Sequence, residues 1–74
     1  MPDHHVYRVT EIVGSSDASV TDAIGTALER ASKTLRNLGW FEVTGIRGSV
    51  GADARPSYQV TLKIGFHLED PDGS

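Results

Sequence analysis

The chain is short, lacks cysteine and is mildly acidic. Its 74 residues suffice for one small domain, in which a single core supplies little net stability. The net charge of -3 argues against broad, sequence-independent binding to nucleic acid, which depends on clustered basic residues. Without cysteine there is neither a disulfide framework nor a thiolate metal site. We therefore expect association with further copies of the chain to stabilise the fold.

The first and last residues of the chain are mostly polar. Residues 1–5 contain no basic segment followed by an apolar run, and no stretch is apolar for long enough to cross a bilayer. We expect a cytoplasmic protein without a membrane partner. Residues 70–74 contain no apolar residue. One domain is expected over residues 1–74, with residues 1–4 and 70–74 as flexible tails.

A first strand and the start of a helix follow from the next twenty residues. Apolar and polar residues alternate from His5 to Val13, which predicts a strand. Residues 14–18 are rich in glycine and serine and predict a turn. Ser19, with Asp22 three residues later, fits a helix N-cap with an acidic capping partner.

An amphipathic helix is predicted over residues 20–38. Its apolar positions recur at steps of three and four residues and form one stripe. The members of this stripe are Ala23, Ile24, Ala27, Leu28, Ala31, Leu35 and Leu38. Gly39 then fits the C-cap. The alanines in the stripe allow the helix to lie close to the surface that it covers.

Two more strands follow the helix. The first is predicted over residues 40–50, where Gly45 and Gly48 mark a bulge, a bend or a close backbone approach. Residues 51–56 predict a turn, and residues 58–69 predict a strand with one apolar face. That face consists of Tyr58, Val60, Leu62, Ile64, Phe66 and Leu68. The order strand, helix, strand, strand predicts an α+β fold, with a three-stranded antiparallel sheet and one helix across one sheet face.

Trp40 is the only tryptophan, and it stands beside a second aromatic residue, Phe41, in the strand predicted over residues 40–50. If Phe41 and Val43 face the helix, Trp40 points to the other face of the sheet. The same face is expected to carry Ile46, Val50 and Gln59. Because a tryptophan buries roughly 150–250 Å², we expect a ligand, another subunit or both to cover this face. Trp40 is then either an interface anchor or a wall against which a ligand stacks.

Five short segments carry a family resemblance. They are residues 11–15 (EIVGS), 38–43 (LGWFEV), 46–48 (IRG), 58–60 (YQV) and 65–69 (GFHLE). Their order and spacing resemble those of the dodecins, which are small flavin-binding proteins, over nearly the whole chain. The resemblance implies a hollow homododecamer in which each sheet wraps around its helix and flavins bind as stacked pairs near two-fold axes. It implies FMN, or alternatively FAD or riboflavin, as the cofactor, and coenzyme A as a further ligand of some members.

The resemblance also implies roles for single residues. Trp40 is expected against the isoalloxazine ring, and Gln59 at the polar edge of that ring, where an amide can both donate and accept hydrogen bonds. Arg47 is expected at the ribityl or phosphate part of the ligand, or else in an interface salt bridge. His67 stands where many bacterial relatives have arginine. Phosphate is therefore expected to be held less firmly, with a weaker preference for FMN over riboflavin, or else in a pH-dependent manner. Arg8 is a further phosphate candidate.

The remaining candidates concern coenzyme A, metals and catalysis. Arg30, Thr34 and Arg36 are candidates for coenzyme A, although basic residues on a helix more often face solvent. His4 and His5 are adjacent, with no carboxylate at metal-ligand spacing, so we assign no metal site. Neither a nucleophile elbow nor a glycine-rich phosphate loop is present.

We therefore expect a non-catalytic protein that stores FMN or a related flavin and suppresses its photoreactivity. The alternatives are an assembly-only shell or interaction protein, a coenzyme A carrier, and a flavin-using enzyme.

Overall fold

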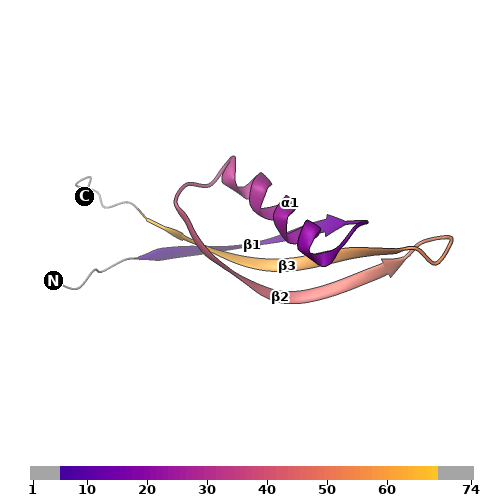
Figure 1. Ribbon diagram of the computed structural model, residues 1–74. Coiled ribbons are helices and arrows are strands. Elements are labelled where there is room, and N and C mark those ends of the chain that lie inside the picture. Colours follow the sequence, from indigo (N-terminus) through magenta and orange to yellow (C-terminus); the bar gives the residue numbers. More distant parts are fainter. Residues whose placement is uncertain (1–5, 69–74) are drawn as a thin grey trace.

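The computed structural model describes residues 6–68 and confirms the predicted order of elements (Figure 1). The elements are β1 (Tyr7–Ser16), α1 (Val20–Ser32), β2 (Leu38–Val50) and β3 (Pro56–His67). The tails predicted at residues 1–4 and 70–74 lie outside the described residues.

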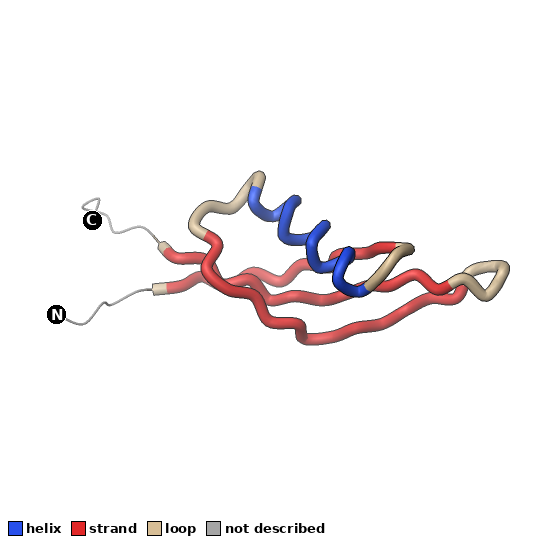
Figure 2. Tube along the Cα trace, in the orientation of Figure 1, coloured by secondary structure: helices blue, strands red, loops and turns tan. Residues whose placement is uncertain are grey.

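The three strands form one antiparallel sheet in the order β1-β3-β2, so the last strand of the sequence lies in the middle. The helix α1 crosses one face of this sheet, above β1 and β3 (Figures 1 and 2). The strands curve toward the helix, and no other described element covers the opposite face. We call the two sides the helix face and the outer face.

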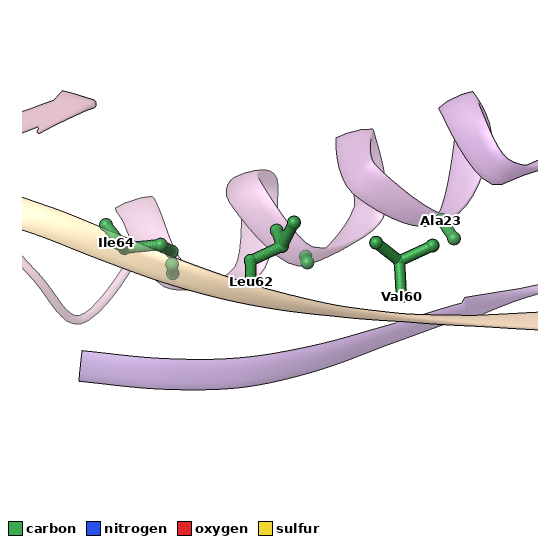
Figure 3. Packing of buried hydrophobic residues seen from close by; sticks show 6 residues of the cluster. Ala23, Val60, Leu62 and Ile64 are labelled. Carbon is green, nitrogen blue, oxygen red and sulfur yellow. The ribbon is translucent and has the colours of Figure 1, made fainter. Parts of the chain in front are cut away.

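The core lies between β3 and α1. Val60, Leu62 and Ile64 point from β3 toward the helix and are fully buried (Figure 3). They pack against three alanines of α1, namely Ala23, Ala27 and Ala31. The alternation predicted for β3 is therefore confirmed. Because the alanine side chains are small, the helix backbone can lie close to the sheet.

Gly14 provides the corresponding space on β1. A Cβ atom at this position would clash with the carbonyl oxygen of Ala23 and lie 2.7 Å from Cβ of Ala27. Gly14 pairs with Val60 within the sheet, so the prediction of a turn at residues 14–18 is wrong at its start. The glycine serves close helix packing here, and the strand continues to Ser16.

The helix begins as predicted. Ser19 is the N-cap, and its Oγ accepts a hydrogen bond of 2.9 Å from the backbone N–H of Asp22. The carboxylate of Asp22 does not complete the usual capping box. It accepts a hydrogen bond of 2.6 Å from the hydroxyl of Ser16, which also accepts one of 2.9 Å from the backbone N–H of Ala18. These contacts tie the end of β1 to the first turn of α1.

The helix ends earlier than predicted, at Ser32 and not at Leu38. Asn37 has a φ of 61°, a left-handed conformation that asparagine tolerates better than most residues. The chain therefore reverses before Gly39, which lies inside β2 and is not the C-cap. Leu35 and Leu38 pack against the core from outside the helix, which explains why the apolar spacing extends beyond it.

A bulge in β2 changes which side chains share a face. The register with β3 shifts between Val43 and Gly45, so Thr44 is the extra residue. Beyond it, Ile46 lies opposite the buried Val60, on the helix face. Val50 has the same parity as Ile46. The prediction that Ile46 and Val50 share a face with Trp40 is therefore wrong, because strict alternation fails at the bulge.

Candidate functional site

Trp40 lies near the start of β2 on the outer face of the sheet. Its neighbour Phe41 is paired with Ile64, whose side chain is buried against the helix. Cross-strand partners share a face and successive strand residues alternate, so Phe41 is on the helix face and Trp40 is on the outer face. The expectation for Trp40 itself is confirmed. Its partner across the sheet is Gly65.

The indole of Trp40 lies with one face against the backbone of β3. A Cβ atom built on Gly65 would come well within 3.0 Å of Cε2, Cζ2 and Nε1 of the indole. The bridging carbon Cε2 would be nearest, and its two ring neighbours only slightly farther away. The contact is therefore made through the face of the ring and not through its edge. Trp40 is still 41% exposed, so its opposite face is open.

Tyr7 and His67 extend this aromatic surface toward the edge of the sheet. They are direct partners between β1 and β3, with ring centroids 5.8 Å apart. The ring centroid of Tyr7 is 6.4 Å from that of Trp40, and the two ring planes are inclined by 58°. His67 was among the predicted site residues, whereas Tyr7 was not. Tyr7 has the same parity as Val9 and Val13 in β1, and the pairing with β3 places all three on the outer face.

Gln59 and Arg47 are direct cross-strand partners at the other end of the same face. Gln59 lies six residues before Gly65 on β3, and both have the parity of the outer face. At about 3.3 Å per residue, their Cα atoms are roughly 20 Å apart. The structure thus confirms the shared face of Trp40 and Gln59, but it does not bring the two side chains together within one chain.

A row of alternating charge separates the two ends of the outer face. Glu11 of β1, Lys63 of β3 and Glu42 of β2 are paired across the three strands. Opposite charges in adjacent positions favour each other across a sheet. Arg47 has Gln59 as its cross-strand partner and lies outside this row. Its guanidinium group therefore lacks a carboxylate directly opposite it on β3.

The other basic candidates lie away from Trp40. Arg8 is paired with Phe66 and has the parity of the helix face. Arg30 and Thr34 line a hollow of about 280 Å³ between α1 and β1. Arg36 lies beyond the helix, where it lines a second hollow of about 260 Å³ together with Thr34 and His67. The structure thus brings Thr34 close to both arginines, but it does not gather all three around one hollow.

Two further properties concern the described residues as a whole. Within residues 6–68, no group of three or more histidine, cysteine, aspartate or glutamate side chains is arranged to hold a metal ion. In the same part of the chain, no helix has the length and hydropathy that a membrane span requires.

Comparison with known proteins gives one consistent family. The family model named Dodecin matches residues 6–69. The dodecin of Thermus thermophilus is 51% identical over 65 residues, which are 88% of this chain and 94% of that protein. The structure of the dodecin from Streptomyces davaonensis superposes with a TM-score of 0.86 at 47% identity, covering 92% of this chain and all of that one.

A more distant relative shares the fold alone. The calcium dodecin of Mycobacterium tuberculosis, described as a calcium-chelating antigen, has a TM-score of 0.78 at 24% identity. The superposition covers 89% of this chain and 94% of the calcium dodecin. The family model covers most of the sequence, and the relative from Thermus thermophilus is aligned over nearly its full length. The chain therefore belongs to the dodecin family.

Proposed function

We propose that this protein binds a flavin, represented by FMN, by stacking the isoalloxazine ring on the open face of Trp40. The single observation that carries the proposal is the orientation of the indole, with one face on Gly65 and the other exposed. A flat aromatic ligand can gain contact on this surface without any change in the sheet. Offset stacking of aromatic rings contributes about 0.5–1.5 kcal/mol beyond the area that is buried.

The proposed site needs a second copy of the chain. Trp40 and Gln59 point to the same face but are roughly 20 Å apart along β3. One isoalloxazine ring cannot contact both residues of a single chain. A two-fold axis through the outer face brings Trp40 of one copy toward Gln59 and Arg47 of another, and it does so twice. The flavin then stacks on the indole while the amide of Gln59 binds its pyrimidine edge.

The bare apolar surfaces of the chain support such an assembly. On the helix face, α1 leaves β2 uncovered, and Ile46 and Val50 are 59% and 77% exposed. On the outer face, Val9 and Val13 are also exposed. Exposed patches of this kind are typical of surfaces that bind other proteins. Members of the dodecin family assemble as homododecamers, and we propose the same assembly for this chain.

The proposed role is storage and protection of the flavin, without turnover. In the two-fold arrangement, paired flavins lie between two indoles, so both faces of each ring are covered. A substrate then has no access to the reactive ring atoms. An adjacent indole can also quench the excited flavin by electron transfer, which limits photochemical damage. Arg47 is the basic residue adjacent to Gln59, and we assign it to the ribityl or phosphate part of FMN.

A fluorescence titration with FMN tests the proposal. Because Trp40 is the only tryptophan, its emission reports directly on the proposed site. We expect the emission of both FMN and Trp40 to fall together until the site is saturated. Trp40→Ala should bind FMN at least about tenfold more weakly, since it removes the stacking surface.

Tyr7→Phe serves as the control, because it keeps the neighbouring ring and changes no part of the Trp40 contact. Its FMN affinity should remain within about threefold of the original protein, a change of less than about 0.7 kcal/mol. If FMN is not quenched at micromolar protein, or if Trp40→Ala binds it equally well, the proposal is wrong.

A further inference from the structure

We propose that Gly65 is a positioning residue for Trp40, because its missing side chain holds the indole flat on the sheet in the orientation that accepts a ligand. Gly65 lies in the middle of the sheet, directly opposite Trp40, and is itself buried. The inference rests on the proposed flavin function. It identifies the structural origin of the stacking surface.

The glycine is needed for space and not for its backbone conformation. Asn37 and Ala54 are the non-glycine residues with positive φ in the described part of the chain, whereas Gly65 has no such conformation. Any residue type can therefore adopt the backbone angles of Gly65. A Cβ atom at this position, however, would clash with Cε2, Cζ2 and Nε1 of the indole. Even alanine requires the ring to move.

The direction of that movement is constrained by Tyr7. Its ring lies beside the indole, and its Cε1 would be 3.1 Å from a Cβ atom on Gly39, the residue before Trp40. The aromatic ring of Tyr7 thus reaches across β3 to Gly39 of β2. With Tyr7 on one side and the sheet below, the indole displaced by a side chain at position 65 must tilt outward. It then enters the space in which the flavin would stack.

Gly45 offers a matched control on the same face. It lies opposite Thr61 in the same pair of strands, and a Cβ atom there would be 3.9 Å from Cβ of Thr61, an ordinary contact. Gly45→Ala therefore adds the same methyl group to the outer face without touching the indole. Comparing it with Gly65→Ala separates displacement of Trp40 from a general effect of glycine replacement in a strand.

The first experiment needs no flavin. We expect Gly65→Ala to change the emission maximum and the near-ultraviolet circular dichroism of Trp40, whereas Gly45→Ala leaves both unchanged. Unchanged Trp40 spectra in folded Gly65→Ala protein overturn the inference. This result stands independently of whether the protein binds any flavin.

The second experiment measures FMN affinity by titration. Gly65→Ala should weaken binding about tenfold, the size of a lost aromatic stack, and Gly45→Ala should not. If the original protein binds FMN and Gly65→Ala binds it equally well, the inference fails while the proposed function survives. If the original protein binds no FMN, the proposed function fails, but the spectra still decide whether Gly65 positions Trp40.

A double variant covers the case in which Gly65→Ala does not fold. Trp40→Ala/Gly65→Ala lacks the ring with which the added methyl group collides. It should fold as well as Trp40→Ala alone, and the thermal unfolding midpoints of these two proteins should agree. If Gly65→Ala destabilises the protein equally with and without the indole, the two residues are not coupled and the inference is overturned.

Discussion

The orientation of Trp40 depends on Gly65, a neighbour that has no side chain. The indole is 41% exposed although one of its faces is in contact with the sheet. A tryptophan standing upright on the outer face would instead present an edge to a ligand. The open face is therefore a product of the pair and not of the tryptophan alone.

The side-chain amide of Gln59 can be tested by a single substitution. Gln59→Met keeps the length of the side chain but removes the amide that is proposed to bind the flavin pyrimidine. The loss of such hydrogen bonds should weaken FMN binding by about 1 kcal/mol, or roughly fivefold. Isothermal titration calorimetry measures the change.

The matched control for Gln59 is Ser57→Ala, which lies on the same strand and removes a hydroxyl that bonds Ser49 instead. FMN affinity should be unaffected in that variant. Equal affinities for Gln59→Met and the original protein would show that the amide does not bind the ligand.

At the scale of single elements, close packing of α1 on β1 depends on small residues from both sides. Gly14 faces Ala23 and Ala27, and a Cβ atom on the glycine would clash with the helix. The helix also has a glycine without such a role. A Cβ atom on Gly25 would meet nothing within 4 Å.

Replacing these two glycines by alanine should change the free energy of unfolding in opposite directions. Gly14→Ala should lower the free energy of unfolding by about 1–3 kcal/mol, because it overfills a tight contact. Gly25→Ala should raise it by roughly 0.5–1 kcal/mol, because alanine favours the helix. Urea unfolding measures both changes. Destabilisation by Gly25→Ala, or none by Gly14→Ala, would contradict the packing described.

The sequence predicted these elements well where one local signal acted alone. The alternation of β3 identified Val60, Leu62 and Ile64 as core, and Ser19 marked the helix start. The sequence-based prediction failed at residues whose type fits two different structural roles. Gly14 resembled a turn residue because packing and turns both select glycine, and Leu35 extended the helical spacing because it reaches the core from the following loop.

The alternation of side chains along the strands predicted part of the candidate site. Trp40 and Gln59 were assigned to a common face from their parity, and the register confirms it. The bulge at Thr44 moved Ile46 to the helix face, a change that no alternating pattern contains. Tyr7 was missed because its position beside Trp40 depends on the order β1-β3-β2, which places their strands on either side of β3.

For the whole molecule, the main feature is a helix that covers only part of its sheet. The apolar side chains on the helix face of β2 remain exposed, among them Phe41, Ile46 and Val50. A chain of 74 residues with so much bare apolar surface is stabilised when further copies cover it. A second contact, through the outer face, would complete the proposed flavin site with Trp40 of one copy and Gln59 of another.

Ile46→Glu tests whether the helix face of β2 is an interface between copies. The substitution places a charge on the surface that we propose to be buried between copies, where an unpaired charge is costly. The particle should become smaller in analytical ultracentrifugation. Its FMN affinity should stay within about threefold, a change of less than about 0.7 kcal/mol, because the proposed two-fold contact through the outer face is untouched.

Thr26→Glu adds the same charge on the exposed surface of α1 and is the control. Its particle size should match that of the original protein. A particle of unchanged size after Ile46→Glu would show that this surface is not an interface.

The most direct test of the central claim is the electron density of FMN in crystals of its complex with this protein. The isoalloxazine ring should lie on the open face of Trp40, with the indole still flat on Gly65. Gln59 of a second copy should lie at the pyrimidine edge. A hollow of about 410 Å³ lies between α1 and β2 and is lined by Leu28 and Phe41, among others. Flavin density in that hollow, away from the open face of the indole, or an indole face covered by protein with the flavin elsewhere, would contradict the proposed site.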